Sequence, residues 1–152
     1  MNRRSFLTLA AAACALGAAP MRLRAAQPRL DVAKSQTCGC CEAWVDHMRA
    51  AGFDARVTDL DDDALYALKA RSGLHPDLWS CHTARIGGYV IEGHVAAADV
   101  RRLLDEQPAA LGLAAPGMPI GSPGMELDGR VDPYDTLLVG LDGSASIFAS
   151  HG

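Results

Sequence analysis

Three cysteines in four residues, Cys38-Gly39-Cys40-Cys41, are the densest group of reactive side chains in the sequence. They stand where an apolar run ends and a helical pattern begins. A helix N-terminus carries partial positive charge and free N–H groups, which favour thiolate over thiol. Because thiolates are both nucleophiles and soft-metal ligands, the motif indicates thiol redox chemistry, a soft-metal site, or both. Disulfides between such close neighbours would constrain the unfolded chain very little, which argues against a purely structural role.

A second signal is Cys81-His82, and His94 follows it after a short strand pair. If Cys81 begins the strand after the second helix, we expect it beside the start of the first helix, where it would close a cluster with the other three thiols. Either histidine could complete a metal site, and position alone does not choose between them. The alternatives are a plain Cys40–Cys81 disulfide and a backbone-bonded core role for His82.

Met118 and Met125 are a weaker signal, because methionine is usually a core filler. Both lie in a segment rich in proline and glycine, with no strand or helix period that would bury them. Thiolate and thioether ligands select soft ions, and Cu(I) above all. Zinc sites commonly use two separated ligand pairs, whereas this chain has one dense cluster, so the residues favour a copper–thiolate site with bridging sulfurs. An iron–sulfur cluster is a less expected alternative after export.

The elements that must position these residues follow the order strand, helix, strand, helix, strand, strand, helix. Apolar residues recur at helical spacing from Cys41, and Gly52 ends that helix. Gly87-Gly88 predicts a two-residue hairpin between two later strands. The pattern is a βαβ unit followed by a ββα unit, and a Cys-x-x-Cys at the first strand-to-helix junction is typical of a thioredoxin-like α/β fold.

Beyond this pattern, residues 108–133 are expected to form a long Pro/Gly-rich loop, either disordered or functional. Two strands around Asp142-Gly143 then predict a C-terminal β-hairpin. The chain has 152 residues, near the size of one domain, and 49% of them are hydrophobic. Its net charge is −4 and it has no basic stretch, which argues against a nucleic-acid partner.

Residues 1–26 are expected to be a cleaved signal peptide, which leaves residues 27–152 as a single mature domain. Arg3-Arg4 with a following Ala-rich apolar run resembles a twin-arginine signal, and an ordinary secretory signal is the alternative. The apolar run is too short to span a bilayer comfortably, so we expect no stable membrane insertion. The predicted location is the periplasm.

Five stretches form a joint pattern over nearly all of the mature chain: residues 34–41, 44–45, 80–84, 88–95 and 116–126. Together they resemble a family of small exported bacterial proteins that are thioredoxin-like, bind metal, are described by a domain of unknown function and are associated with copper resistance. The resemblance implies a periplasmic copper-binding protein, with ligands from the cysteine cluster, Cys81 and nearby histidines, and with a proposed redox role.

The leading hypothesis is a periplasmic Cu(I)-binding protein of copper homeostasis or resistance, with a multinuclear cluster as one form of the bound metal. Its partners would be copper ions and other periplasmic copper-handling proteins. The candidate metal ligands are Cys38, Cys40, Cys41, Cys81, His82, His94, Met118 and Met125. The alternative is a thiol–disulfide oxidoreductase in which Cys38 attacks and Cys41 resolves. A third hypothesis is a disulfide-stabilised structural or interaction domain.

Overall fold

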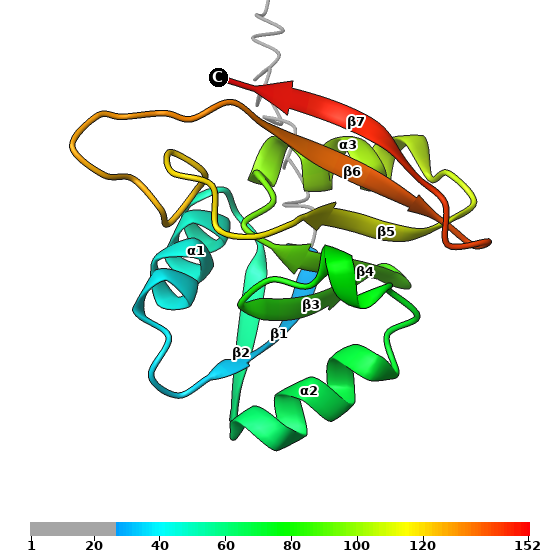
Figure 1. The fold of residues 1–152 in the computed structure, drawn as a ribbon, viewed down its shortest axis with the longest axis horizontal. Coiled ribbons are helices and arrows are strands. Elements are labelled where there is room, and N and C mark those ends of the chain that lie inside the picture. Colours follow the sequence, from blue (N-terminus) through cyan, green and yellow to red (C-terminus); the bar gives the residue numbers. More distant parts are fainter. Residues whose placement is uncertain (1–26) are drawn as a thin grey trace, which may run out of the picture.

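The computed structural model describes residues 27–152, and the expected signal peptide at residues 1–26 lies outside this range. Seven strands form one mixed sheet, accompanied by three α-helices and a short 3-10 helix, η1 (Figure 1). The strands are β1 (Arg29–Ser35), β2 (Asp54–Leu60), β3 (His82–Ile86), β4 (Tyr89–Gly93), β5 (Ala110–Ala115), β6 (Tyr134–Gly140) and β7 (Ala145–His151). The helices are α1 (Gly39–Ala50), α2 (Asp62–Ala70), η1 (Pro76–Leu78) and α3 (Ala97–Glu106).

The sheet order is β2-β1-β3-β4-β5-β6-β7. β1 and β2 are parallel and are joined through α1, whereas β3 pairs antiparallel with β1 and with β4. Gly87 and Gly88 have positive φ angles of 57° and 90°, the conformation that a tight two-residue hairpin turn requires. Because β3 lies directly beside β1, the residue before β3 stands next to the turn that leads from β1 into α1.

Helices α1 and α3 contribute to one continuous apolar core against the sheet. The buried residues of α1 fall at helical spacing, as a helix that covers a sheet requires: Cys41, Trp44, Val45 and Met48. Adjacent residues of one strand pack into different hydrophobic clusters, because successive side chains point to opposite faces of the sheet. Ile91 of β4 belongs to the α1–α3 core, whereas Val90 belongs to a second cluster with Leu74 and Val139.

The segment expected to be one long loop contains a strand. β5 pairs parallel with β4 and antiparallel with β6, so it lies inside the sheet (Figure 1). Its sequence, Ala-Leu-Gly-Leu-Ala-Ala, has no polar alternation and no β-branched residue, so neither strand signal is present. At Gly112 an added Cβ would lie 1.8 Å from the Val90 carbonyl oxygen, so the position admits only glycine.

The remaining loop, residues 116–133, returns across the N-terminal end of α1. At Gly124, an added Cβ would lie 2.7 Å from both the Cys40 carbonyl oxygen and the Trp44 nitrogen, which shows how closely this backbone approaches the helix. β6 and β7 then pair antiparallel at one edge of the sheet. Among residues 27–152, no helix is long and apolar enough to cross a membrane.

Candidate metal centre

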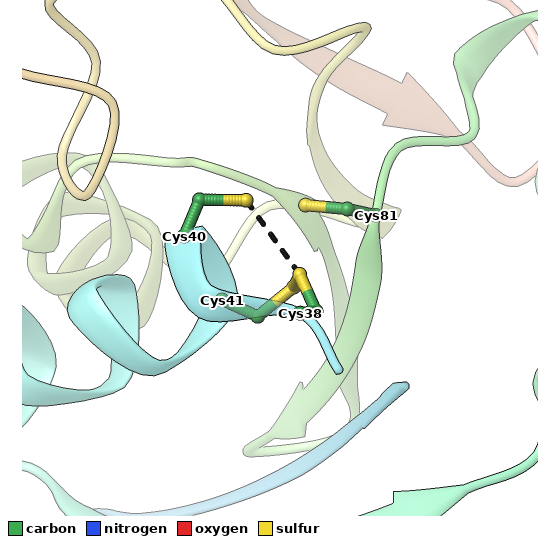
Figure 2. A group of neighbouring side chains, drawn as sticks. All are labelled: Cys38, Cys40, Cys41 and Cys81. Atoms are coloured by element: carbon green, nitrogen blue, oxygen red, sulfur yellow. Dashed lines mark hydrogen bonds between the residues drawn. A yellow bond between two sulfur atoms is a disulfide. The ribbon is translucent and has the colours of Figure 1, made fainter. Parts of the chain in front are cut away.

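Helix α1 begins immediately after Cys38, which is its N-cap residue and has an extended backbone. The Cys38 and Cys41 sulfurs form a disulfide in this structure, across a Cα–Cα distance of 5.3 Å (Figure 2). Cys41 belongs to the buried stripe of α1 and has no exposed surface, whereas Cys38 is half-buried. The two sulfurs of the pair therefore differ sharply in access to solvent.

Cys40 and Cys81 are free thiols, and both are half-buried. The Cys40 sulfur lies 3.6 Å from that of Cys38, and the side chain of Cys81 points toward them from the segment before β3 (Figure 2). All four sulfurs lie within 4.8 Å of one another. The fold thus brings together every cysteine of the described chain at the entrance of α1.

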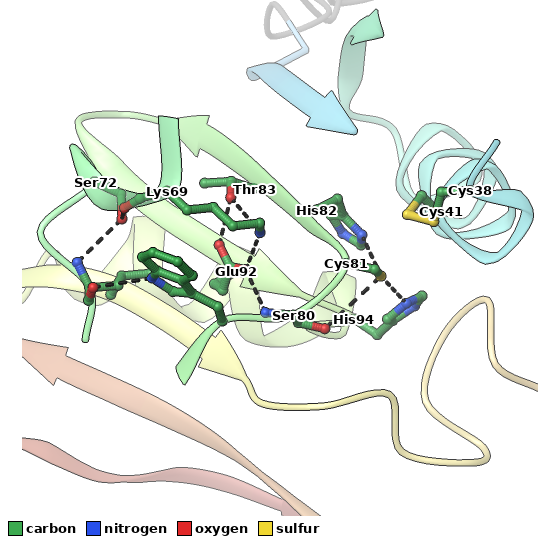
Figure 3. A network of polar contacts seen from close by, with 12 residues as sticks. Cys38, Cys41, Lys69, Ser72, Ser80, Cys81, His82, Thr83, Glu92 and His94 are labelled. Carbon is green, nitrogen blue, oxygen red and sulfur yellow. Dashed lines mark hydrogen bonds and ion pairs between the residues drawn. A yellow bond between two sulfur atoms is a disulfide. The ribbon is translucent and has the colours of Figure 1, made fainter. Parts of the chain in front are cut away.

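The two candidate histidines extend this group from the side of Cys81. The Cys81 sulfur lies 2.9 Å from Nε2 of His94 and 3.4 Å from Nδ1 of His82 (Figure 3). Both imidazoles are fully buried, and the His82 ring also lies against the Trp44 ring, with centroids 4.3 Å apart. The structure therefore places both histidines at the cluster.

The two rings differ in how their second nitrogen is held. Nδ1 of His94 lies 2.8 Å from the Pro123 carbonyl oxygen, so it must carry the proton and donate it. That tautomer leaves the Nε2 lone pair free to face Cys81. Nε2 of His82, in contrast, has no hydrogen-bond partner among the described residues. In metal-bound histidines, the ring nitrogen that does not bind the metal usually donates a hydrogen bond. His94 makes such a hydrogen bond, and His82 does not.

Burial shifts the ionisation of these groups. Desolvation lowers the pKa of His82 well below its usual value and also lowers the pKa of His94, so both rings are neutral near pH 7. Desolvation, followed by the neighbouring Cys40, raises the pKa of Cys81 to about 12. The imidazoles are thus ready to act as ligands, whereas a metal that binds Cys81 must displace its proton.

The two methionines occupy different places. Met118 is 54% exposed and lines an open cleft of about 730 Å³, together with Cys38 and Cys81. Met125 is half-buried in a tight turn, where its N–H donates to the Ser122 carbonyl, and it is not part of the cleft wall. Of the two methionines, Met118 alone therefore lines this cleft beside Cys38 and Cys81.

A buried ion pair beneath the cluster was missed by the sequence analysis. Nζ of Lys69 on α2 lies 2.5 Å from Oε1 of Glu92 on β4, and both side chains are almost completely inaccessible (Figure 3). The Glu92 carboxylate also accepts hydrogen bonds from the Ser80 N–H at 2.7 Å and the Thr83 hydroxyl at 2.6 Å. Burial raises the pKa of Glu92, and the Lys69 ammonium opposes that shift. The network fixes the backbone directly before Cys81.

The signal for this pair was a glutamate inside the otherwise apolar strand Tyr-Val-Ile-Glu-Gly. Its partner lies in α2 four residues after Leu65, on the buried side of that helix. A charged residue at each of two inward positions indicates a buried pair, because a lone buried charge would be too costly.

Comparison with known proteins places the chain in a family. Residues 78–125, from η1 to the turn after Pro123, match the family described as protein of unknown function, DUF411. Two solved structures of copper resistance protein CopG, form 2 and form 1, are each 40% identical to the chain. Form 2 has a TM-score of 0.77, with coverage of 83% of this chain and 99% of that one; form 1 has a TM-score of 0.76, with 82% and 98%.

This chain belongs to the copper-resistance-associated DUF411 family. The resemblance stated from the sequence is thereby confirmed. The family match spans Cys81, both candidate histidines and both methionines, and it ends before β6. No curated protein matches the chain.

Proposed function

We propose that this protein binds copper as Cu(I) through a cluster of four cysteine thiolates and acts in periplasmic copper resistance. The observation that carries the proposal is the convergence of Cys38, Cys40, Cys41 and Cys81 within 4.8 Å. Thiolates this close can bridge metal ions, and soft sulfur ligands favour Cu(I) over harder cations. The likeness to copper resistance protein CopG supports copper as the metal.

His94 is the proposed nitrogen ligand. Its Nε2 already faces the Cys81 sulfur at 2.9 Å, and its Nδ1–H is held by the Pro123 carbonyl. This hydrogen bond fixes the tautomer and ring orientation that coordination through Nε2 requires. For His82 we propose a packing role rather than a ligand role, since its ring lies against Trp44. Met118 is proposed as an entry ligand at the cleft, and Met125 as part of the covering loop.

The disulfide supports a redox role as the second part of the proposal. When the Cys38 and Cys41 thiolates each give one electron to a Cu(II) ion, two Cu(I) ions and the observed disulfide result. The cluster is then available only after the disulfide has been reduced again. The alternative, a thiol–disulfide oxidoreductase without copper, would use the same pair, with Cys38 as the attacking sulfur and Cys41 as the resolving one.

We propose a thioredoxin-like domain, residues 27–152, because the disulfide spans the N-cap and the first turn of the helix that follows β1. The residues near the disulfide are themselves possible ligands, because the Cys81 sulfur lies within 4.8 Å of both disulfide sulfurs and 3.4 Å from Nδ1 of His82. We propose that residues 1–26 act as a cleaved twin-arginine signal and that copper ions and other periplasmic copper-handling proteins are the partners.

The test is an anaerobic Cu(I) titration of the reduced protein, with copper measured by elemental analysis and free thiols by alkylation. We expect more than one copper per chain, with all four thiols protected from alkylation. Cys81→Ser should lose copper, whereas Ser146→Ala, an exposed position on β7, should not. A reduced protein that binds no Cu(I) tightly, yet exchanges its disulfide readily, would favour the oxidoreductase instead.

A further inference from the structure

We propose that the cleft in front of Cys38 is the docking site for a cysteine-bearing, basic segment of a dithiol protein that reduces the Cys38–Cys41 disulfide. This inference rests on the proposed redox role of the pair and names the partner class that would restore the copper-binding state. The cleft holds about 730 Å³ and has the sulfur-bearing residues Cys38 and Cys81 in its wall.

Access decides which sulfur the partner reaches. Cys38 lines the cleft and is half-buried, whereas Cys41 has no exposed surface. A partner thiolate can therefore approach only the Cys38 sulfur. The leaving sulfur, Cys41, lies in the first turn of α1, where the helix N-terminus stabilises a thiolate. The preferred direction of attack follows from this asymmetry.

The exchange balances in two steps. The partner thiolate attacks the Cys38 sulfur, a mixed disulfide forms, the Cys38–Cys41 bond breaks, and Cys41 leaves as a thiolate. The second thiol of the partner, as thiolate, then attacks the partner's own sulfur in the mixed disulfide, and Cys38 leaves as a thiolate. The partner ends as a disulfide, having supplied two electrons, and the two thiolates bind Cu(I) or take up protons.

The size of the cleft indicates an occupant larger than a metal ion, and its rim favours a polypeptide. A bare ion needs an opening of only a few ångströms, whereas this volume lies within the range of about 300–1,000 Å³ that organic ligands occupy. Tyr66 is 62% exposed at the cleft, and its ring lies 6.0 Å from that of Trp79. Met118 completes an exposed aromatic and thioether rim, and residues of these kinds are enriched in protein interfaces.

The charge of the cleft favours a basic segment. Two charged residues line it, Asp62 and Lys69. The Lys69 ammonium is bound to Glu92 and is 5% exposed, so it presents little charge to the cleft. Asp62 has no ion-pair partner among the described residues, and it stands between Asp61, the N-cap of α2, and Asp63, which are both exposed. The remaining field is negative, and it would attract lysine or arginine next to the partner's cysteine.

The test compares reduction of the disulfide in the copper-free protein by a Cys-x-x-Cys peptide flanked by lysines, its glutamate-flanked counterpart, glutathione and dithiothreitol. Alkylation followed by mass measurement counts free thiols over time. Each rate is divided by the same reductant's rate with a small model disulfide, which removes differences in intrinsic thiol reactivity. We expect the basic peptide to exceed the acidic one by about tenfold at low salt.

Substitutions at the rim of the cleft test whether the preference for the basic peptide arises there. Tyr66→Ala should slow reduction by the basic peptide about fivefold, and Asp62→Asn about threefold with a weaker salt dependence. Both should leave reduction by dithiothreitol unchanged, which shows that the disulfide itself is intact. Ile147→Ala and Asp105→Asn, exposed positions on β7 and α3, serve as matched controls and should change nothing.

Equal normalised rates for the two peptides, insensitive to both rim substitutions, would overturn the proposal. Glutathione acting as fast as the basic peptide, with the same loss in Tyr66→Ala, would also overturn it, because the cleft would then take a small thiol. The Cu(I) stoichiometry of the same variants is measured separately. Unselective reduction with normal copper binding refutes only the docking site, whereas absent copper binding refutes only the proposed function.

Discussion

Glu92→Gln is expected to destabilise the protein strongly, because it removes one partner of a buried ion pair. The Lys69 ammonium, 5% exposed, would then face only neutral acceptors, the Gln amide oxygen and the Thr83 hydroxyl at 2.9 Å, and no anion. Breaking a buried pair from one side costs about 3–5 kcal/mol, a large share of the roughly 5–15 kcal/mol that holds a typical domain folded. The melting temperature should fall by on the order of 10 °C or more.

The assay is urea unfolding of the copper-free protein, with a second substitution and a matched control. Lys69→Met in the Glu92→Gln background removes the unpaired charge and should recover about 1–3 kcal/mol. Glu106→Gln breaks an exposed pair with Arg102, in which both side chains are about half accessible, and should cost less than about 0.5 kcal/mol.

Glu92→Gln also has a chemical consequence at the cysteine cluster. Glu92 holds the Ser80 N–H at 2.7 Å, directly before Cys81. We expect Glu92→Gln to raise the alkylation rate of Cys81 relative to that of Cys40, since the segment carrying Cys81 loses its anchor. A loss below about 1 kcal/mol, or no recovery on adding Lys69→Met, would refute the role assigned to the pair.

Three further predictions concern the histidines and the sheet. His94→Gln should weaken Cu(I) binding by about tenfold or more, and His82→Gln by less, as measured by competition with a chromogenic Cu(I) chelator; equal losses would contradict the assignment of His94. Burial lowers the pKa of both imidazoles, so below about pH 6.5 the unfolded chain binds protons that the folded chain does not. The unfolding free energy of the copper-free protein should therefore decrease as the pH falls below this value, by up to about 1.4 kcal/mol per pH unit for each ring. Stability that holds or rises on acidification would count against this burial. Gly112→Ala should prevent folding, since its Cβ would meet the Val90 backbone. Gly39→Ala, whose Cβ would have nothing within 4 Å, should fold normally, and circular dichroism measures both outcomes.

The sequence was sufficient to predict those parts of the fold that local patterns determine. The helical spacing that begins at Cys41 and the Gly87-Gly88 turn predicted the elements on either side of the site, and the mixed α/β architecture followed from their order. The position of Cys81 beside the start of α1 could be expected, because strand order brings β3 next to β1. These inferences needed only periodicity, turn chemistry and topology.

Other features depend on contacts between distant segments, which no local pattern encodes. β5 is stabilised by pairing on both sides, although its Ala- and Gly-rich sequence has little strand propensity. The orientation of His94 depends on the Pro123 carbonyl, 29 residues away. Nε2 of His47 on α1 accepts from the Ala97 N–H and so caps α3, whose own N-cap residue makes no side-chain hydrogen bond.

Likewise, nothing in the sequence around His151 indicated a partner. Its Nε2 lies 2.9 Å from the Asp99 carboxylate and 3.1 Å from the Thr136 hydroxyl, so it ties β7 to α3 and β6. Such a contact becomes visible only when the sheet order is known, because β7 and α3 are about fifty residues apart in the chain. Its role is structural and lies apart from the metal centre.

X-ray absorption at the copper edge of the Cu(I)-loaded, fully reduced protein tests the central claim most directly. The account predicts a Cu(I) edge, a first shell dominated by sulfur, a nitrogen contribution that disappears in His94→Gln, and metal–metal scattering from copper ions bridged by Cys38, Cys40, Cys41 and Cys81. A first shell made only of nitrogen and oxygen, or one unchanged when Cys81 is replaced by serine, would contradict it.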